Sequence, residues 1–153
     1  MSILQINDVL MNSLILLREI IDSLNDNSIP TVVFGGWAEE LAGIIESREH
    51  KDIDLLYEAG NFNLVDKLFL NSHELKEICQ KHFHHKRAFL FKEVMVEIFL
   101  VENDLYGDFT NFWGKTKHYW PQPFAINKKG LNIATPRVLN SYRENYDKLK
   151  YLK

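Results

Sequence analysis

Two consecutive glycines, Gly35 and Gly36, constrain the fold of this chain more than any other feature of the sequence. They follow a β-branched and aromatic run at 31–34 and precede a segment rich in helix formers at 37–45. A strand that ends at glycines before a helix lets the backbone approach a ligand, and it directs free helix N–H groups at an anion. The pattern predicts a buried strand, a sharp turn and a helix. The turn is interpreted either as a phosphate cradle or as a plain tight connection.

Helical periodicity recurs along the chain. Apolar residues at three- and four-residue spacing predict an amphipathic, core-packing helix at 3–25. A further helix is expected at 62–70, and the stretch to Cys79 continues or repeats it. Thr135 and Pro136 have the character of an N-cap and a first helical residue, which predicts a last helix to about residue 149.

Strand-like patterns alternate with these helices. Strands are expected at 31–34, 52–57, 82–91 and 94–101. Lys92 and Glu93 would form the tight turn of a hairpin between the last two strands. The aromatic-rich stretch 104–130 is expected to be irregular, because Pro121 and Pro123 interrupt it. The fold class predicted from this order is α/β (α+β), a small mixed twisted sheet flanked by helices.

The bulk properties set broad limits on function. The length of 153 residues predicts a single domain over 1–153, with a core that needs no disulfide. The net charge of −3 gives no general basic surface for nucleic acid, so nucleic acid is not an expected partner. The lone cysteine, Cys79, and the lack of a signal peptide or a membrane-length apolar run predict a cytoplasmic protein that does not enter a membrane.

Asp52 and Asp54 are the first candidate site residues. On a strand, alternate residues share a face, so both carboxylates point the same way while Ile53 and Leu55 face the core. Adjacent carboxylates repel each other unless a cation lies between them, and hard oxygen ligands suit Mg²⁺. The alternative is a solvent-facing acidic pair on an edge strand.

Glu97 is the third candidate. It lies on the strand 94–101, on the face opposite Val96 and Ile98, flanked by Met95 and Phe99. A carboxylate among apolar residues on a central strand is costly to bury without a partner, and a metal ion would supply one. The alternative is an ordinary solvent-facing strand residue.

Residues 81–87 form the one basic cluster of the sequence. On a strand, His82 and His84 would share a face and His85 would take the other. A zinc site needs further converging ligands, and only Cys79 lies near in sequence. A solvated basic strand is therefore favoured over zinc, with contact to a triphosphate or an acceptor as a third interpretation.

The segment Gly35-Gly36-Trp37, followed by Arg48-Glu49-His50-Lys51-Asp52-Ile53-Asp54-Leu55, resembles the small antibiotic nucleotidyltransferases. These are the aminoglycoside and lincosamide adenylyltransferases of the DNA polymerase β-like superfamily. Gly43 also lies where this subgroup often has glycine. The resemblance is strong over 33–57 and weaker as far as Glu97, where these enzymes often have aspartate instead.

The resemblance implies a polymerase β palm-like fold and a metal-dependent nucleotidyltransferase. Asp52, Asp54 and Glu97 would be the catalytic, metal-binding residues and would hold two Mg²⁺ ions, with Glu97 on the acceptor side as a candidate general base. Five residues would contact the nucleotide: Gly35, Gly36, Trp37, Arg48 and His50. ATP or another NTP would donate its nucleoside monophosphate to a hydroxyl of a small molecule and release pyrophosphate.

Other functions fit parts of the same pattern. The superfamily includes toxin–antitoxin-type partner proteins that bind NTP, and transferases that modify protein or tRNA. Three clustered carboxylates without metals would be a net cost, which argues against a catalytically idle partner. Because the chain has little room beyond a catalytic domain, a homodimer that completes the acceptor site is a further expectation.

Overall fold

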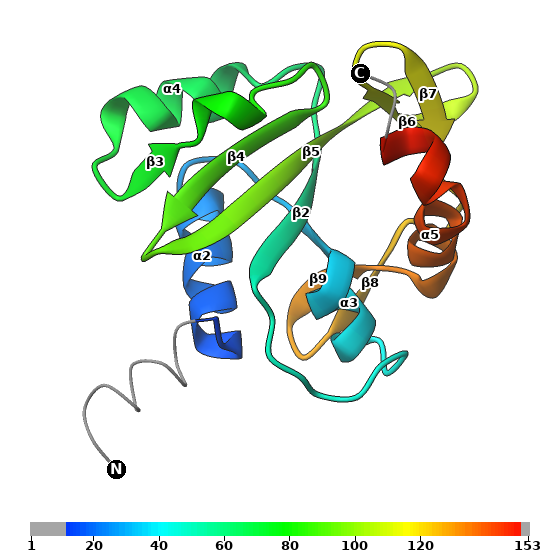
Figure 1. Ribbon diagram of the computed structural model, residues 1–153, viewed down its shortest axis with the longest axis horizontal. Helices are drawn as coiled ribbons and strands as arrows, with labels where there is room; N and C mark the ends of the chain where they lie inside the picture. The colour runs from blue at the N-terminus through cyan, green and yellow to red at the C-terminus, as the bar shows by residue number, and fades with distance from the viewer. Residues whose placement is uncertain (1–11, 151–153) are drawn as a thin grey trace.

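The computed structural model describes residues 12–150 (Figure 1). The part of the expected first helix before residue 12 lies outside this range. Among the described residues, four α-helices and a short 3₁₀-helix accompany nine strands. The helices are Leu14–Asp26 (α2), Gly35–Leu41 (α3), Asn63–Asn71 (α4) and Pro136–Lys150 (α5), and the 3₁₀-helix is Cys79–Lys81 (η1). No helix in this range is long and apolar enough to cross a membrane.

The strands form one mixed sheet in the order β3-β4-β5-β2-β1-β9-β8, and β6 and β7 extend it from the far end of β5. Two neighbouring pairs are parallel, β2 with β5 and β1 with β9, and the others are antiparallel. The strand bounds are Val32–Phe34 (β1), Asp52–Glu58 (β2), Leu75–Glu77 (β3), Lys86–Phe91 (β4), Val94–Asp104 (β5), Gly107–Phe112 (β6), Thr116–Tyr119 (β7), Ala125–Lys128 (β8) and Leu131–Ala134 (β9).

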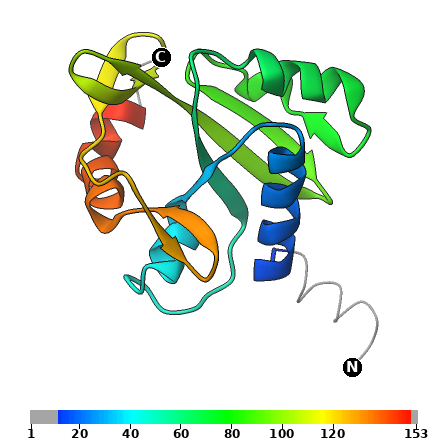
Figure 2. The same cartoon turned by 180° about the vertical axis from the view of Figure 1, so that it is seen from behind.

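Helices cover both faces of this sheet. Figures 1 and 2 show α2 on one face and α3 on the other, where α3 lies next to α5. Ser13 caps α2 by accepting a hydrogen bond from the Leu16 amide, and the helix buries Leu17, Ile20 and Leu24. The α/β class with a mixed sheet and flanking helices is confirmed.

Most of the expected elements are confirmed, and the hairpin turn at Lys92 and Glu93 is among them. Both residues have positive φ, of 48° and 68°, as a two-residue type I′ turn requires. The last helix begins at Pro136, directly after Thr135, whose side chain lies 3.4 Å from the Val138 amide.

Several boundaries were wrong. The second helix ends at Leu41 rather than near residue 45, and residues 75–77 form β3 instead of continuing a helix. The strand expected at 82–91 begins only at Lys86, because the chain before it forms η1 and a turn in which Phe83 and Lys86 bond to each other. His82 and His84 are therefore not on a strand.

The expectation of an irregular stretch at 104–130 was also wrong. It holds three strands, β6 to β8, and the hairpin that joins β8 to β9 turns at Lys129 and Gly130. These two residues have φ of 53° and 80°, another type I′ turn with glycine in second position. The prolines do not break the strands because they lie between β7 and β8, outside both.

Candidate active site

Three carboxylates meet where β2 and β5 run side by side. The parallel pairing sets Asp54 opposite Glu97 and Asp52 opposite Met95, so Asp52, Asp54 and Glu97 share one face of the sheet. Asp52 is exposed, Asp54 is partly buried, and Glu97 is only 8% exposed. The expectation that the strands of these residues belong to one sheet is confirmed, while their catalytic roles stay a prediction.

The closeness of these carboxylates and their burial shift their pKa values. Burial raises the pKa of Asp54 to about 7, and the neighbouring charges of Glu97 and Asp52 add to the effect. Burial and Glu97 also raise the pKa of Asp52. Carboxylates in this state would be stabilised by a cation, so the oxygen donor set fits a hard divalent ion such as Mg²⁺.

Glu97 is compensated by two lysines. Lys86 Nζ lies 2.6 Å from Oε2, and Lys81 Nζ lies 3.2 Å from Oε1. Burial would raise the pKa of Glu97, but the ammonium groups outweigh it and hold this pKa below its ordinary value. Glu97 therefore has the partner that its burial was expected to require, supplied by two lysines. Its role as a metal ligand stays a prediction, since each carboxylate oxygen keeps a lone pair for a further ligand.

Side chains of the site approach the backbone closely at both glycines. Gly35 has φ of +60°, and a Cβ there would collide with Oδ2 of Asp54. A Cβ at Gly36 would lie 3.0 Å from Nδ1 of His50 and 3.2 Å from the Arg48 guanidinium. Close approach of the protein's own side chains thus explains both glycines, in addition to the predicted approach of a ligand.

The segment that leads into β2 is anchored by a polar network. Oε1 of Glu40 accepts the Arg48 amide at 3.0 Å and lies 2.9 Å from Nε2 of His50. The Asn12 amide donates to the His50 carbonyl at 2.6 Å, and its oxygen accepts from Trp37 Nε1 at 3.0 Å.

Trp37 and His50 stack with ring centroids 4.2 Å apart, and both are only 6% exposed. These two side chains hold the segment in place. Their predicted contact with a nucleotide stays a prediction.

A cavity of about 330 Å³ opens beside Asp52 and Asp54 on the α3 side. Arg48, His50 and Lys51 supply cationic or hydrogen-bonding groups to its wall, Glu49 supplies a further carboxylate, and Gly36 completes the lining. Basic groups directly beside two carboxylates suit a ligand that combines phosphates with a divalent cation.

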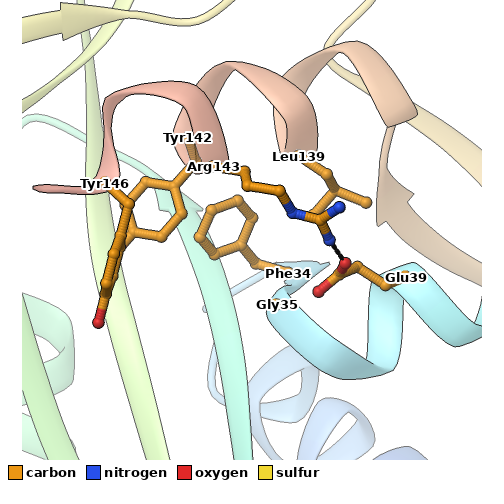
Figure 3. Close-up of a pocket in the computed structure, with 7 residues that line it drawn as sticks. All are labelled: Phe34, Gly35, Glu39, Leu139, Tyr142, Arg143 and Tyr146. Atoms are coloured by element: carbon orange, nitrogen blue, oxygen red, sulfur yellow. Dashed lines mark ion pairs between the residues drawn. The ribbon is translucent and has the colours of Figure 1, made fainter. Parts of the chain in front are cut away.

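A second cavity, of about 240 Å³, lies between α3 and α5 (Figure 3). Phe34, Tyr142 and Tyr146 form its aromatic side, and an ion pair between Glu39 and Arg143 joins the two helices across it. The Tyr142 ring packs against Phe34 with ring centroids 5.0 Å apart, and Phe34 pairs with Asp54 across β1 and β2. The last helix is thus a wall of the site.

Sequence reasoning missed several of these groups. Lys81 and Lys86 were noticed only as part of a basic cluster. The alternation of side chains along β4 could have placed Lys86 on the same face of the sheet as Glu97. Glu40, Asn12 and Tyr142 carry no local signal. The hydrogen bonds of Glu40 and Asn12 join residues 8 to 38 positions apart, and Tyr142 packs against Phe34 of the distant strand β1.

The other members of the basic cluster take separate positions. Nδ1 of His82 lies 2.8 Å from Glu77, His84 lies 3.6 Å from Glu102, and His85 is buried. Asp66, Glu77 and His82 come within metal-ligand reach of one another, but Arg87 binds Asp66 at 2.7 Å and opposes a cation there. Cys79 is exposed and is not part of this group.

The pH dependence of the stability of the metal-free protein should depend on the protonation of Asp54. Above about pH 4 an unfolded aspartate has lost its proton, whereas folded Asp54 keeps it until about pH 7. The folded state therefore binds more protons in this window, and Asp54 lowers stability as pH rises through it. Asp54→Asn should stabilise the protein in EDTA, with a gain over wild type that grows between about pH 4 and pH 7 by at most about 1.4 kcal/mol per pH unit and levels off above pH 7.

Urea unfolding of both proteins at four pH values measures this gain. The difference between the two proteins is the proper quantity, because burial lowers the pKa of His85 to about 3 and gives both an opposite slope. A gain that is the same at pH 5 and pH 8 would contradict the electrostatic account of Asp54.

Comparison with known proteins agrees with this geometry. The sequence model of the aminoglycoside-2''-adenylyltransferase family matches residues 16–88, which include both glycines, Asp52 and Asp54. No curated protein sequence matches the chain significantly.

Two solved structures share the fold. The lincomycin-bound lincosamide antibiotic adenylyltransferase LnuA aligns with a TM-score of 0.67 and 15% identity, over 92% of this chain and 98% of that one. ANT(2'')-Ia in complex with adenylyl-2''-tobramycin aligns with a TM-score of 0.60 and 11% identity, over 86% and 75%. The resemblance to antibiotic nucleotidyltransferases is confirmed, and so is the relationship to enzymes of the nucleotidyltransferase class.

Proposed function

We propose that this protein is a metal-dependent nucleotidyltransferase that moves AMP from ATP to a hydroxyl group of a small, antibiotic-like molecule. The observation that carries the proposal is the trio Asp52, Asp54 and Glu97 on adjacent parallel strands, next to a cavity that Arg48 and Lys51 line together with the two aspartates. The family match over 16–88 supports the reaction class, and the antibiotics bound to the two similar structures support a small-molecule acceptor.

The residues of the site would divide into metal ligands and phosphate-binding groups. Asp52 and Asp54 would hold Mg²⁺, two ions in all, and Glu97 would ligate on the acceptor side. Bound Mg²⁺ would neutralise the triphosphate and stabilise the charge that develops on the transferring and leaving oxygens. Arg48, His50 and Lys51 would bind the phosphates in the cavity beside α3, because their cationic and N–H groups line it.

The transfer itself is a displacement at phosphorus. The acceptor oxygen forms a bond to the α-phosphorus, the bond from that phosphorus to the bridging oxygen breaks, and pyrophosphate leaves with the electron pair. Glu97, held ionised by Lys86 and Lys81, accepts the hydrogen bond of the attacking hydroxyl and takes its proton as the new bond forms. The two lysines orient this carboxylate and prevent its protonation before the acceptor arrives.

Nucleotide binding should depend on divalent metal. Without it, the triphosphate meets three carboxylates at short range and is repelled. Calorimetry should therefore give an ATP affinity at least tenfold higher with Mg²⁺ than with EDTA. Equal affinities in both conditions would contradict the metal-bridged geometry.

A pyrophosphate-release screen tests the reaction. Each NTP is paired with a panel of hydroxyl acceptors that includes lincomycin, tobramycin, a protein mixture and tRNA. Release that requires Mg²⁺ and one of the small molecules supports the proposal. Release only with protein or tRNA would assign the chain to a macromolecule-modifying transferase, and metal-dependent binding without any release would assign it to the NTP-binding partner proteins.

A further inference from the structure

A third cavity, of about 180 Å³, lies between the β4–β5 region and the C-terminal end of α5. The cavity that Arg48 and Lys51 line adjoins Asp52 and Asp54 near α3, and the two cavities share no lining residue. In the sheet order β4-β5-β2-β1, Glu97 on β5 stands between the third cavity and the two aspartates of β2. The third cavity is therefore on the side where Glu97 would meet an acceptor.

Three lining residues connect this cavity to the reacting groups. Lys86 lines it and holds Oε2 of Glu97 at 2.6 Å. Phe99 lines it two residues after Glu97 on β5, so the two side chains share a face of the strand. Tyr142 lines it as well, and its pKa is raised by burial first and by the charges of Asp54 and Glu97 in addition.

The walls of the cavity are mainly aromatic. Phe99, Trp113 and Tyr142 contribute ring surface, and the Lys86 ammonium lies 5.0 Å from the centre of the Phe99 ring. Flat apolar groups bind such walls through stacked or edge-on contacts. At about 180 Å³ the cavity holds one ring system rather than a whole drug-sized molecule.

His85 adds one directed donor. It is 2% exposed, and its Nδ1 accepts the Trp113 amide at 3.0 Å, so the proton of the neutral ring resides on Nε2. Burial lowers the pKa of His85 to about 3, which keeps the ring neutral at physiological pH. Among residues 12–150 the structure records no hydrogen bond for Nε2, so this N–H is available to an acceptor atom of a ligand in the cavity that His85 lines.

Two lining residues, Lys86 and Lys150, are cationic. Within residues 12–150, which the structure describes, no acidic residue lines this cavity. The Glu97 carboxylate lies nearby but is already bonded to Lys86 and Lys81. An ammonium group in this cavity would lose its hydration beside two other ammonium groups, and the one nearby carboxylate, Glu97, already has its charge offset by Lys86 and Lys81.

We propose that this cavity binds the acceptor of the transfer reaction, and that the acceptor is a hydroxyl compound with a flat ring and a hydrogen-bond-accepting oxygen but no positive charge on the bound part. The inference rests on the proposed nucleotidyl transfer and narrows its substrate class. It excludes polycationic aminoglycosides as good acceptors. The ring lies against Phe99 and Trp113, its oxygen accepts from His85 Nε2, and its hydroxyl faces Glu97.

Three probes of similar size test the charge preference: 4-(hydroxymethyl)benzoate, 4-(hydroxymethyl)benzamide and 4-(hydroxymethyl)benzylammonium. Their affinities are measured by NMR titration of the full chain with Mg²⁺ and a non-hydrolysable ATP analogue. The benzoate and the benzamide should bind, and the benzylammonium and tobramycin should bind at least tenfold more weakly than the benzoate. A cationic probe or tobramycin that binds as tightly as the benzoate overturns the inference.

Lys150→Glu tests the location, with Lys148→Glu as the matched control on the same helix. Lys150 lines the cavity, Lys148 does not, and both are exposed, so both variants should fold. Reversing a charge roughly 5 Å from the probe should lower the ratio of benzoate to benzylammonium affinity by about tenfold. The control should change it less than twofold, and equal changes in the two variants would overturn the location.

The analogue serves as the independent measure of the proposed function. If it binds with Mg²⁺ but no probe binds, the acceptor inference is wrong and the nucleotidyltransferase proposal stands. If the analogue fails to bind with Mg²⁺, the proposed function fails whatever the probes do.

Discussion

Asp54→Asn should reduce turnover by at least 10³-fold while making the metal-free protein more stable. The substitution keeps the shape of the side chain and removes one negative charge from the group that lies against Gly35 and opposite Glu97. A metal ligand supplies several kcal/mol of transition-state stabilisation, and each 1.36 kcal/mol is a factor of ten in rate. The same charge is unfavourable in the empty site, where burial and two carboxylates raise the pKa of Asp54 to about 7.

The opposite signs of these two effects identify the role. Replacing a residue that serves only the fold lowers the stability of the protein. Replacing a charged residue that serves to bind metal raises the stability of the metal-free protein, because the unpaired charge is unfavourable there. Steady-state kinetics with a verified acceptor and urea unfolding in EDTA provide the two measurements. Asp22→Asn, on the exposed face of α2, is the matched control and should change neither. Wild-type turnover in Asp54→Asn would remove Asp54 from the catalytic site.

Glu97→Gln should lower turnover by about 10²-fold or more, the usual scale for a general base, and leave Mg²⁺–ATP affinity nearly intact. The reason is its position, since Glu97 stands on the acceptor side and Asp52 and Asp54 remain to bind the metal with the triphosphate. This variant should also be less stable without metal, in contrast to Asp54→Asn. Lys86 is largely buried and would lose the carboxylate at 2.6 Å that compensates its charge.

Calorimetry separates nucleotide affinity from turnover, and a thermal scan shows that the assay temperature lies below unfolding. Glu102→Gln is the matched control because it lies on the same strand, five residues on, and pairs only loosely with His84 at 3.6 Å. If Glu97→Gln keeps wild-type turnover, the third carboxylate is misassigned. Glu102 and Glu93 are the acidic residues next to be tested, although Glu93 lies in the β4–β5 turn.

Local pattern was sufficient to predict the core of this site. The two-residue period of a strand places Asp52 and Asp54 on one face whatever the rest of the chain does, and the glycines predict a sharp strand-to-helix turn before them. The hairpin at Lys92 and Glu93 was equally local. By contrast, the aromatic residues and prolines of 104–130 led to the wrong prediction of an irregular segment. Strand formation there depends on pairing with β5 and β9, which the local sequence does not show.

The sequence by itself determined which carboxylates could act together, through strand period and the resemblance over 33–57. Only the tertiary structure decided what surrounds them. The parallel pairing of β2 with β5 is a contact between distant segments, and it sets Glu97 beside Asp54. Lys86 and Lys81 compensate Glu97, and α5 closes the aromatic cavities, because side chains far apart in sequence fill the same space. Burial then sets the pKa of Asp54 and of His85, and burial is a property of the packed molecule that no local pattern contains.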